Sequence, residues 1–273
     1  MPKNAVLANL TIHKYSNEIN DRSIAATVAR ENHAKVSEDR YIKKRIPKIH
    51  MRKITTIISQ VITTHRTWTS PWFDGGIRIL PAKLSLKYLA KMKELRKALE
   101  VEVERVADTL RAIDAENQRT RGNLYNPNEI PSRDVFCRAF NIDTTILPFS
   151  TADDFRVDII TDQMKKQYED VMTVKLSMNT PHVLDLFNDP LNRLSSTTRY
   201  YQSTMDKLQF AVDIAPDMIL DDKMLDKVKD LCNTVEDNVL CFAIEDIRKD
   251  QNIEEKFLEG ISMSQKCLGS LYA

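Results

Sequence analysis

The sequence predicts an α+β fold that is predominantly helical, with one long helix over about residues 85–117 and a small sheet of three to four short strands. Apolar residues recur at helical spacing through most of the chain, while β-branched stretches are short and confined to the N-terminal and middle regions. The strands are too few for the five-stranded OB-fold. With 273 residues, 42% of them hydrophobic, the chain is long enough to bury a sizeable core.

The first quarter of the chain is expected to contain one strand and two helices. Residues 5–14 include β-branched side chains and alternate roughly in polarity, which is typical of a strand. Residues 17–33 resemble a short helix capped near Asn20 or Asp21. Over residues 49–67 apolar side chains recur every three or four positions, which predicts an amphipathic helix.

A loop and a short strand then lead into the longest helix. TSPWFDGG (69–76) places two of only five glycines near a proline, which favours a loop. IRILP (77–81) is predicted to be a strand that ends at its proline. The long helix follows from Ser85 to about Asn117, on the order of 50 Å at 1.5 Å per residue, and Gly122 is placed to end it.

The rest of the chain is predicted to contain two strands followed by helices. NIDTTILPF (141–149) and FRVDII (155–160) have the composition of strands. From residue 163 onward the pattern is helical. We expect interruptions of the helices at Pro181, Pro190 and Pro216.

Charge distinguishes a basic N-terminal region (1–125), a segment that completes the sheet (126–162) and an acidic helical region (163–273), which we expect to pack as one domain. Residues 1–125 carry 24 Lys/Arg and 13 Asp/Glu, and residues 126–273 carry 16 and 26, so the net charge of +1 conceals halves of +11 and −10. This imbalance indicates a polyanionic partner, or attraction between the two halves within one molecule or between subunits.

The densest positive charge lies in RYIKKRIPKIHMRK (40–53), where seven of fourteen residues are Lys or Arg and none is acidic. Pro47 suggests that residues 40–48 form an exposed arm leading into a helix. Solvated faces usually mix both signs, so we expect contact with nucleic acid; docking on an acidic protein surface and no special role are the alternatives. The candidate phosphate contacts are Lys43, Lys44, Arg45, Lys48, Arg52, Lys53 and Arg66.

Aromatic side chains lie close to the basic stretch in sequence. Single-stranded nucleic acid is typically held by cations at its phosphates and by aromatic faces at its bases. We therefore name Tyr41, Trp68 and Trp72 as candidate base contacts. The alternative for the two tryptophans is a position in the core, flanking the Gly-Gly loop.

Motifs of catalysis and cofactor binding are missing from the sequence. The five glycines form neither a P-loop nor G-x-G-x-x-G, the five histidines lack metal-binding spacing, and no serine lies in G-x-S-x-G. The four cysteines form no C-x-x-C pair and are expected to be reduced thiols. We predict no catalytic residue, no cofactor and no metal, and therefore a protein that is not an enzyme.

PDMILDDK (216–223) superficially matches a metal-dependent nuclease, which would use Asp217, Asp221 or Asp222, and Lys223. Such enzymes usually place these carboxylates on strands with a wider gap between the first two. Here a proline and acids precede a helical pattern, as a helix N-terminus prefers. We therefore expect a helix start rather than a metal site.

Three segments resemble a family of tailed-phage proteins whose shared motifs carry no known chemistry. LTIHKYS (10–16), SPWFDGGIRILPA (70–82) and FNIDTTILPFSTADDFRVDI (140–159) are similar to that family's PW-x-D-x-G-x-RILP and ILP…DFRVD segments, over roughly residues 6–160. In size and character the chain also resembles the Drc family of single-stranded-DNA-binding RNA polymerase cofactors from lytic podoviruses. No functional residue can be carried over by motif from either family.

The resemblance implies binding of melted DNA and recruitment of a phage RNA polymerase, with the acidic half as the candidate polymerase contact. We expect a non-enzymatic single-stranded-DNA-binding protein of phage transcription or replication, forming a homo-oligomer because long helices often pair across a dimer. No apolar run approaches a membrane span and the N-terminus lacks signal-peptide features, so we expect no membrane partner and a location in the cytoplasm of the bacterial host. The alternative is a structural or adaptor protein whose basic half binds acidic protein surfaces.

Overall fold

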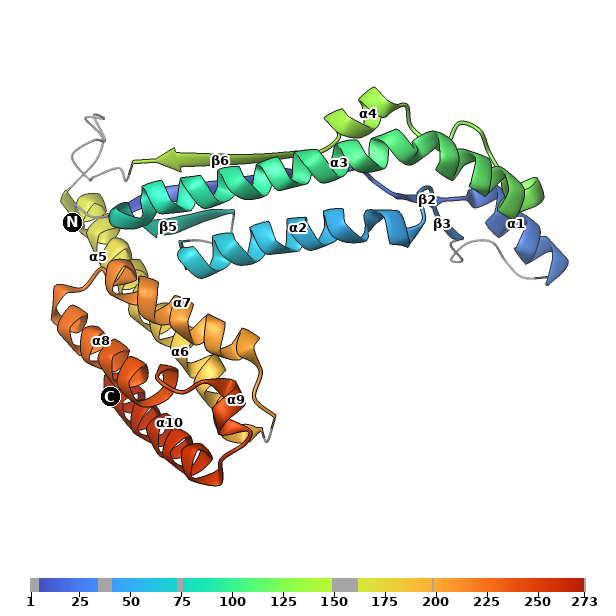
Figure 1. Ribbon diagram of the computed structural model, residues 1–273. Helices are drawn as coiled ribbons and strands as arrows, with labels where there is room; N and C mark the ends of the chain where they lie inside the picture. Colours follow the sequence, from blue (N-terminus) through green and yellow to red (C-terminus); the bar gives the residue numbers. More distant parts are fainter. Residues whose placement is uncertain (1–4, 34–40, 73–75, 149–161, 198, 273) are drawn as a thin grey trace. The chain divides into compact units, whose positions relative to one another are not determined.

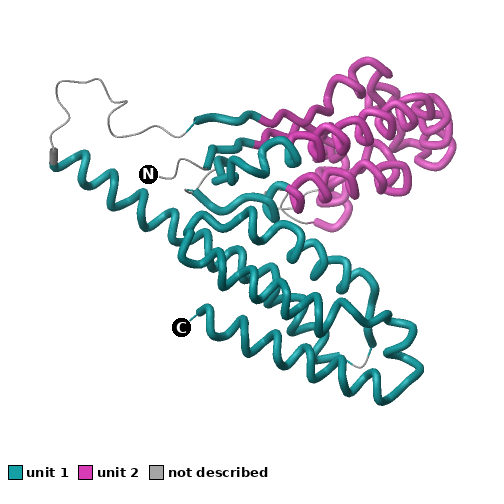
Figure 2. Tube along the Cα trace, turned by 60° about the vertical axis from the view of Figure 1, so that its left-hand side comes forward, with its two compact units in different colours: residues 1–9, 65–88, 145–273 teal, residues 10–64, 89–144 magenta. Residues whose placement is uncertain are grey.

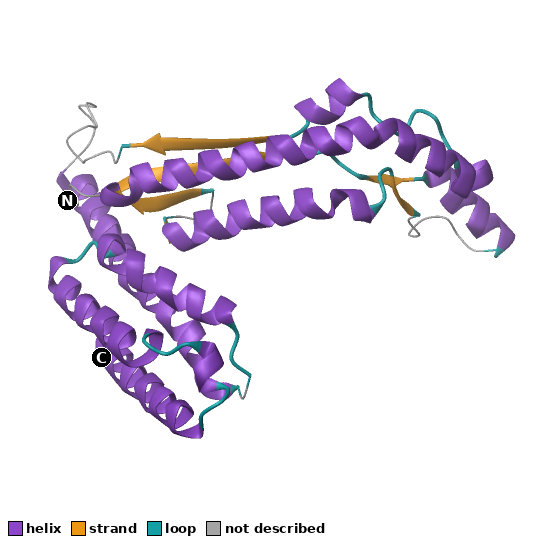
Figure 3. Cartoon of the chain, viewed as in Figure 1, coloured by secondary structure: helices purple, strands orange, loops and turns teal. Residues whose placement is uncertain are grey.

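The computed structural model describes residues 5–33, 41–72, 76–148, 162–197 and 199–272, and its elements confirm the predicted, mainly helical α+β fold (Figure 1). The strands are β1 (Ala5–His13), β2 (Glu18–Asn20), β3 (Ile42–Lys44), β4 (Ser70–Pro71), β5 (Ile77–Pro81) and β6 (Asn141–Leu147). The helices are α1 (Arg22–Glu31), α2 (Lys48–Trp68), α3 (Ser85–Arg121), α4 (Arg133–Arg138), α5 (Asp162–Ser177), α6 (Asn179–Ser196), α7 (Gln202–Met218), α8 (Asp222–Val235), α9 (Ile244–Ile247) and α10 (Gln251–Tyr272). Helices predominate throughout, as Figure 3 shows.

The described strands form a four-stranded sheet, in the order β4-β5-β1-β6, and a two-stranded sheet of β2 and β3. β1 pairs antiparallel with β5, with Ala5 opposite Pro81 and Asn9 opposite Ile77. The predicted strands at 5–14, 77–81 and 141–149 are confirmed as β1, β5 and β6. The predicted strand at 155–160 and residues 73–75 of the predicted loop lie outside the described residues.

Two compact units divide the chain (Figure 2). Unit 1 comprises residues 1–9, 65–88 and 145–273, and unit 2 comprises residues 10–64 and 89–144. Because each unit takes segments from distant parts of the sequence, their borders do not coincide with the predicted boundaries at residues 125 and 162.

Unit 2 is built around the two helices predicted with the clearest periodicity. Up to Thr64 α2 runs alongside α3, which continues from Leu89 in the opposite direction (Figure 1). The buried apolar residues that these two helices contribute to unit 2 are Met51, Ile54, Val61, Met92, Leu95, Leu99, Val103, Val106, Ala107, Leu110 and Ile113. Gly122 ends α3 as predicted, because its φ of +49° lies in the left-handed region that glycine adopts without a steric penalty.

The segment predicted as one helix over 17–33 instead divides into a strand and a helix. Residues 18–20 form β2, in which Ile19 lies opposite Lys43 of β3. The helix α1 begins only at Arg22, and Asp21 caps it by accepting a hydrogen bond from the Ile24 amide (3.3 Å). Pairing with a strand more than twenty residues away outweighs the local helical pattern, which sequence periodicity alone does not register.

The helical prediction from residue 163 onward is confirmed by α5 to α10 in unit 1, but two of its expected breaks are wrong. Pro190 lies inside α6 and Pro216 lies inside the last turn of α7. Pro190 is buried, so packing offsets the cost of about 3 kcal/mol that a proline imposes on a helix interior. Pro181 lies in the first turn of α6, where a missing N–H loses no helical hydrogen bond.

A close approach of two helical segments in unit 1 depends on a glycine. The π-helical turn that follows α8 (Glu236–Leu240) packs against α10 at Gly260. A Cβ atom built at Gly260 would lie 1.9 Å from the carbonyl oxygen of Asn238 and 2.7 Å from its carbonyl carbon. Only a residue without a side chain therefore fits at this position.

Substitution Gly260→Ala is expected to destabilise the protein by about 1–3 kcal/mol or more, because backbone atoms must move to admit the methyl group. Gly269→Ala on the same helix is the matched control, since a Cβ there meets no atom within 4 Å. Urea unfolding followed by circular dichroism measures both variants. Equal stabilities of the two variants would contradict this description of the contact.

Candidate nucleic-acid interface

The basic stretch that suggested nucleic-acid binding contains one lysine whose charge is buried. Lys43 is the middle residue of β3 and is 7% exposed. Its Nζ donates hydrogen bonds to Oε1 of Glu129 (2.7 Å) and to the Leu124 carbonyl, while Oε2 of Glu129 accepts from Nη1 of Arg121 (3.1 Å). We call Lys43, Glu129 and Arg121 the buried ion group. Lys43 therefore has no exposed ammonium to offer to a phosphate.

The backbone that follows Lys43 is fixed by side chains from distant segments. Arg121 donates from Nη2 to the carbonyl of Lys44 (2.6 Å), and Asn117 donates to the carbonyl of Arg45 (3.0 Å). The side-chain amide of Asn17 both accepts from the Ile46 N–H and donates to the Ile46 carbonyl, each at 2.8 Å.

The prediction of an exposed arm over residues 40–48 is wrong for the described part, residues 41–48. β3 and these hydrogen bonds hold the segment in place, and Ile46 is fully buried.

Arg45 is held in place by an aromatic ring. Its guanidinium carbon lies 5.5 Å from the centre of the Tyr15 ring, and Nη1 donates to the Tyr15 hydroxyl (3.0 Å). Tyr15 in turn packs edge-on against Phe136, with ring centres 5.4 Å apart. Arg45, like Lys43, therefore holds segments of unit 2 together through its side-chain contacts.

Four other predicted cations are exposed: Lys44 at the end of β3, and Lys48, Arg52 and Lys53 in the first turns of α2. We call these four residues the cationic patch. Among the described residues, Lys44 has a single, long ion pair, with Glu18 (4.0 Å). Lys48 and Arg52 form no ion pair with any residue that the structure describes. The pKa of Glu102 on α3 is lowered mainly by its hydrogen bond with Arg105. The charge of Lys53, which lies near this carboxyl, lowers the pKa further.

The sequence of α2 supplies no negative charge to this patch. Its 21 residues include no Asp or Glu, and its first turn lacks the acidic side chains that usually complement the positive end of a helix dipole. Cations at that end are disfavoured by a few tenths to about 1 kcal/mol each. The start of α2 is therefore a strongly positive surface that an anion would stabilise.

The predicted base contacts lie in different environments. Tyr41 is 39% exposed, so its ring can be reached from solvent. Trp72 is 8% exposed and belongs to a core cluster of unit 1 with Ala5, Ile79 and Met172. Trp68 is half-buried, with ring centres 5.8 Å from Phe210 and 6.4 Å from Tyr88. The structure thus places Trp72 in the core, which was the alternative to base stacking, whereas Trp68 packs against two rings and stays half-buried.

Arg66, also predicted as a phosphate contact, lies in unit 1 beside an arginine that the sequence analysis missed. Arg66 is exposed, and its carbonyl accepts a hydrogen bond from Nη2 of Arg78 (3.3 Å). Arg78 stands in IRILP, between two isoleucines of the strand β5, and is half-buried. The single charge in an otherwise apolar strand is the sequence feature that could have identified Arg78 as a candidate.

A buried histidine packs near these arginines. His65 is 5% exposed, and its Nδ1 lies 2.6 Å from the Tyr88 hydroxyl. Burial, and then the charge of Arg78, lower the pKa of His65 to about 4, and the same two causes lower the pKa of His182. Both imidazoles are therefore neutral at physiological pH.

The acidic segment 216–223 has structural partners. Asp217 pairs with Lys87 at 3.7 Å, and Asp221 caps α8 by accepting from the Lys223 amide (3.0 Å). Within the described ranges, no group of three or more His, Cys, Asp or Glu side chains is arranged to hold a metal ion. The helix start is at Asp222, as the second half of the segment suggested, whereas Pro216 lies inside the preceding helix, α7, which ends at Met218.

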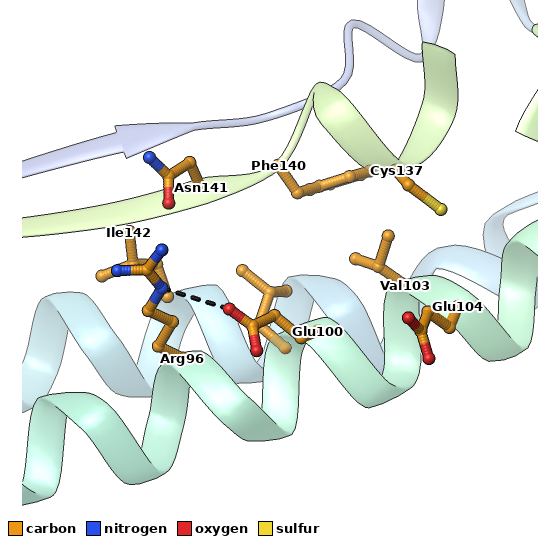
Figure 4. Close-up of a pocket in the computed structure, with 9 residues that line it drawn as sticks. Arg96, Glu100, Val103, Glu104, Cys137, Phe140, Asn141 and Ile142 are labelled. Carbon is orange, nitrogen blue, oxygen red and sulfur yellow. Dashed lines mark hydrogen bonds and ion pairs between the residues drawn. The ribbon is translucent and has the colours of Figure 1, made fainter. Parts of the chain in front are cut away.

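A small cavity of about 90 Å³ lies in unit 2 between α3 and the chain from α4 into β6 (Figure 4). Arg96 and Glu100 form an ion pair at its edge (3.1 Å), and Cys137, Phe140 and Ile142 line the facing side. Burial raises the pKa of the Cys137 thiol, so this cysteine is not an activated nucleophile. The lining supplies packing surface and one ion pair, which favours no particular reaction.

Comparison with protein-family models, with curated proteins and with solved structures finds no match. Among the described helices, none is both long and apolar enough to cross a bilayer.

We expect the free energy of unfolding to fall as the pH is lowered from about 6.5 to about 4. His65 has a pKa of about 4 when folded and the ordinary 6.5 when unfolded, so the unfolded chain binds the proton more tightly across this window. Its contribution is complete above pH 6.5 and is lost at about 1.4 kcal/mol per pH unit below that. Urea unfolding of wild type and His65→Gln at several pH values isolates this slope; parallel curves for the two proteins would contradict it.

Proposed function

We propose that the protein is a non-enzymatic single-stranded-DNA-binding protein of phage transcription or replication, and that unit 2 contacts DNA phosphates through the cationic patch. The observation that carries this proposal is the state of Lys48 and Arg52. Both are exposed, both lie on a helix without acidic residues, and neither has an ion-pair partner among the described residues. Such cations release counterions when they neutralise phosphates, which is the main source of affinity for DNA.

The exposed face of α2 extends this surface with uncharged polar groups. Lys48, Arg52, Thr56 and Gln60 are all exposed and follow one another at a spacing of four residues. That spacing places them on one side of the helix over about 18 Å. Hydroxyl and amide side chains also contact phosphate and sugar in protein–DNA complexes. A strand of several nucleotides fits along this face.

The preference for single strands is supported by Tyr41, which is an exposed aromatic residue close in sequence to the patch, and by the sequence resemblance. Aromatic stacking contributes about 1–3 kcal/mol per base and tolerates any base. Trp68 and Trp72 no longer support the proposal, because their rings pack in unit 1. Recruitment of a phage RNA polymerase is proposed from the resemblance alone.

An adaptor function is the second candidate, because the same patch would attract acidic protein surfaces. Residues 202–272 provide such a surface, with 15 Asp/Glu against 8 Lys/Arg. A second copy of the chain could then bind through opposite charges, which would give a homo-oligomer that dissociates in high salt.

Anisotropy of a labelled oligo-dT tests the proposal with the double variant Lys48→Gln/Arg52→Gln. We expect wild-type affinity to fall steeply with salt, and the variant to bind at least tenfold more weakly. The slope of log K against log salt should decrease in magnitude by about 1.4, because each lost phosphate contact accounts for about 0.7 on a single strand. A duplex of equal length should bind more weakly than the single strand.

The matched control is Lys223→Gln/Lys227→Gln on α8, which removes the same charge at the same spacing from exposed positions. It should bind oligo-dT like wild type. Equal loss in both double variants would show a net-charge effect and overturn the site. Salt-sensitive oligomers without any oligonucleotide binding would favour the adaptor function instead.

A further inference from the structure

Arg78 of β5 is a half-buried cation, and its hydrogen bonds within the described residues all go to uncharged oxygens. Nε donates to Oγ1 of Thr69 (2.6 Å), and Nη2 donates to the Thr69 carbonyl (2.6 Å) and to the Arg66 carbonyl (3.3 Å). These bonds fix the guanidinium plane and occupy one edge of it. Nη1, with two further N–H groups, has no hydrogen-bond partner in the described part of the chain.

The charged group with the largest effect on Arg78 is another cation, so the positive charge of Arg78 is not compensated by the described residues. No carboxylate that the structure describes pairs with it, and the charged group with the largest effect on it is a second guanidinium, that of Arg66. Burial, followed by the charge of Arg66, lowers the pKa of Arg78. The neighbouring His65 and His182 are neutral and supply no negative charge. A partly buried charge without a counter-ion destabilises a fold unless something compensates it.

Oriented guanidinium groups without an acidic partner are suited to anions with several oxygens. Arginine presents planar N–H pairs that match phosphate geometry, and two arginines can each donate to different oxygens of one phosphate. Arg66 is exposed and forms no ion pair in the described ranges, so its side chain is free to close on a ligand held by Nη1 of Arg78.

We propose that Arg78 and Arg66 form a binding site for a tetrahedral oxyanion of the phosphate class. Arg78 is the fixed donor, positioned by Thr69, and Arg66 is the mobile one. The ligand is either free phosphate or a phosphate of a nucleic-acid backbone. The site lies wholly in unit 1 and does not rest on the cationic patch of unit 2.

Isothermal titration and thermal unfolding with inorganic phosphate, against chloride at equal ionic strength, test this site in the full chain. We expect phosphate to bind wild type and to raise its Tm by mass action. Both Arg78→Gln and Arg66→Gln should raise the Kd for phosphate at least tenfold. Because Arg78 is held by the carbonyl of residue 66, Arg66→Gln keeps that hydrogen bond and tests the site even if Arg78→Gln fails to fold.

Arg193→Gln on α6 is the control, since it removes an exposed arginine of the same unit that has no ion pair within the described residues. Equal phosphate binding by wild type, Arg66→Gln and Arg193→Gln would overturn the proposal.

Oligo-dT distinguishes the two sources of phosphate. If the site binds a backbone phosphate, the Arg66→Gln variant should bind oligo-dT more weakly than wild type. If the site binds free phosphate, the affinity for oligo-dT should be unchanged. Lys48→Gln/Arg52→Gln should retain phosphate binding, which separates failure of this site from failure of the proposed DNA surface.

Discussion

The placement of Glu129 between Lys43 and Arg121 is the constraint on which the described structure of unit 2 depends. Both oxygens of this buried carboxylate are used, one by each cation, and Arg121 also holds the carbonyl of Lys44. The group therefore joins β3, the end of α3 and the loop before α4. Removing one member of a buried ion pair typically costs about 3–5 kcal/mol, because the remaining charge is left uncompensated. The backbone path into α2 is thus set by electrostatics as much as by apolar packing.

This constraint divides a stretch that looks uniform in sequence into two functional classes. Lys43 and Arg45 face inward and are committed to Glu129 and Tyr15, whereas Lys44, Lys48, Arg52 and Lys53 face solvent. The fixed residues give the exposed ones a rigid base. A rigid cationic surface loses less conformational entropy on binding a phosphate backbone than a flexible arm would, so the proposed binding depends on the buried ion group without using its charges.

Local periodicity predicted the elements whose pattern is visible within a short stretch of sequence. The helix α2 and the long α3 follow from helical spacing, and Gly122 ends α3 because glycine favours that backbone conformation. What the sequence could not supply are the long-range pairings. Lys43 and Glu129 are 86 residues apart, and β2 becomes a strand only because β3 lies beside it. Pro190 lies buried inside α6, where the local sequence predicted a break. Two of the six cations in a charged cluster can therefore be structural although nothing in the neighbouring sequence indicates it.

The affinity of two neighbouring lysine variants for single-stranded DNA tests this account most directly. Lys43→Met and Lys44→Met remove the same charge one position apart, from a buried and an exposed side chain respectively. Anisotropy of labelled oligo-dT, measured at a temperature where both variants are folded, compares them. The account predicts that Lys43→Met is the less stable protein but binds within about twofold of wild type, while Lys44→Met retains its stability and binds several-fold more weakly. Loss of affinity in folded Lys43→Met as large as in Lys44→Met would contradict it.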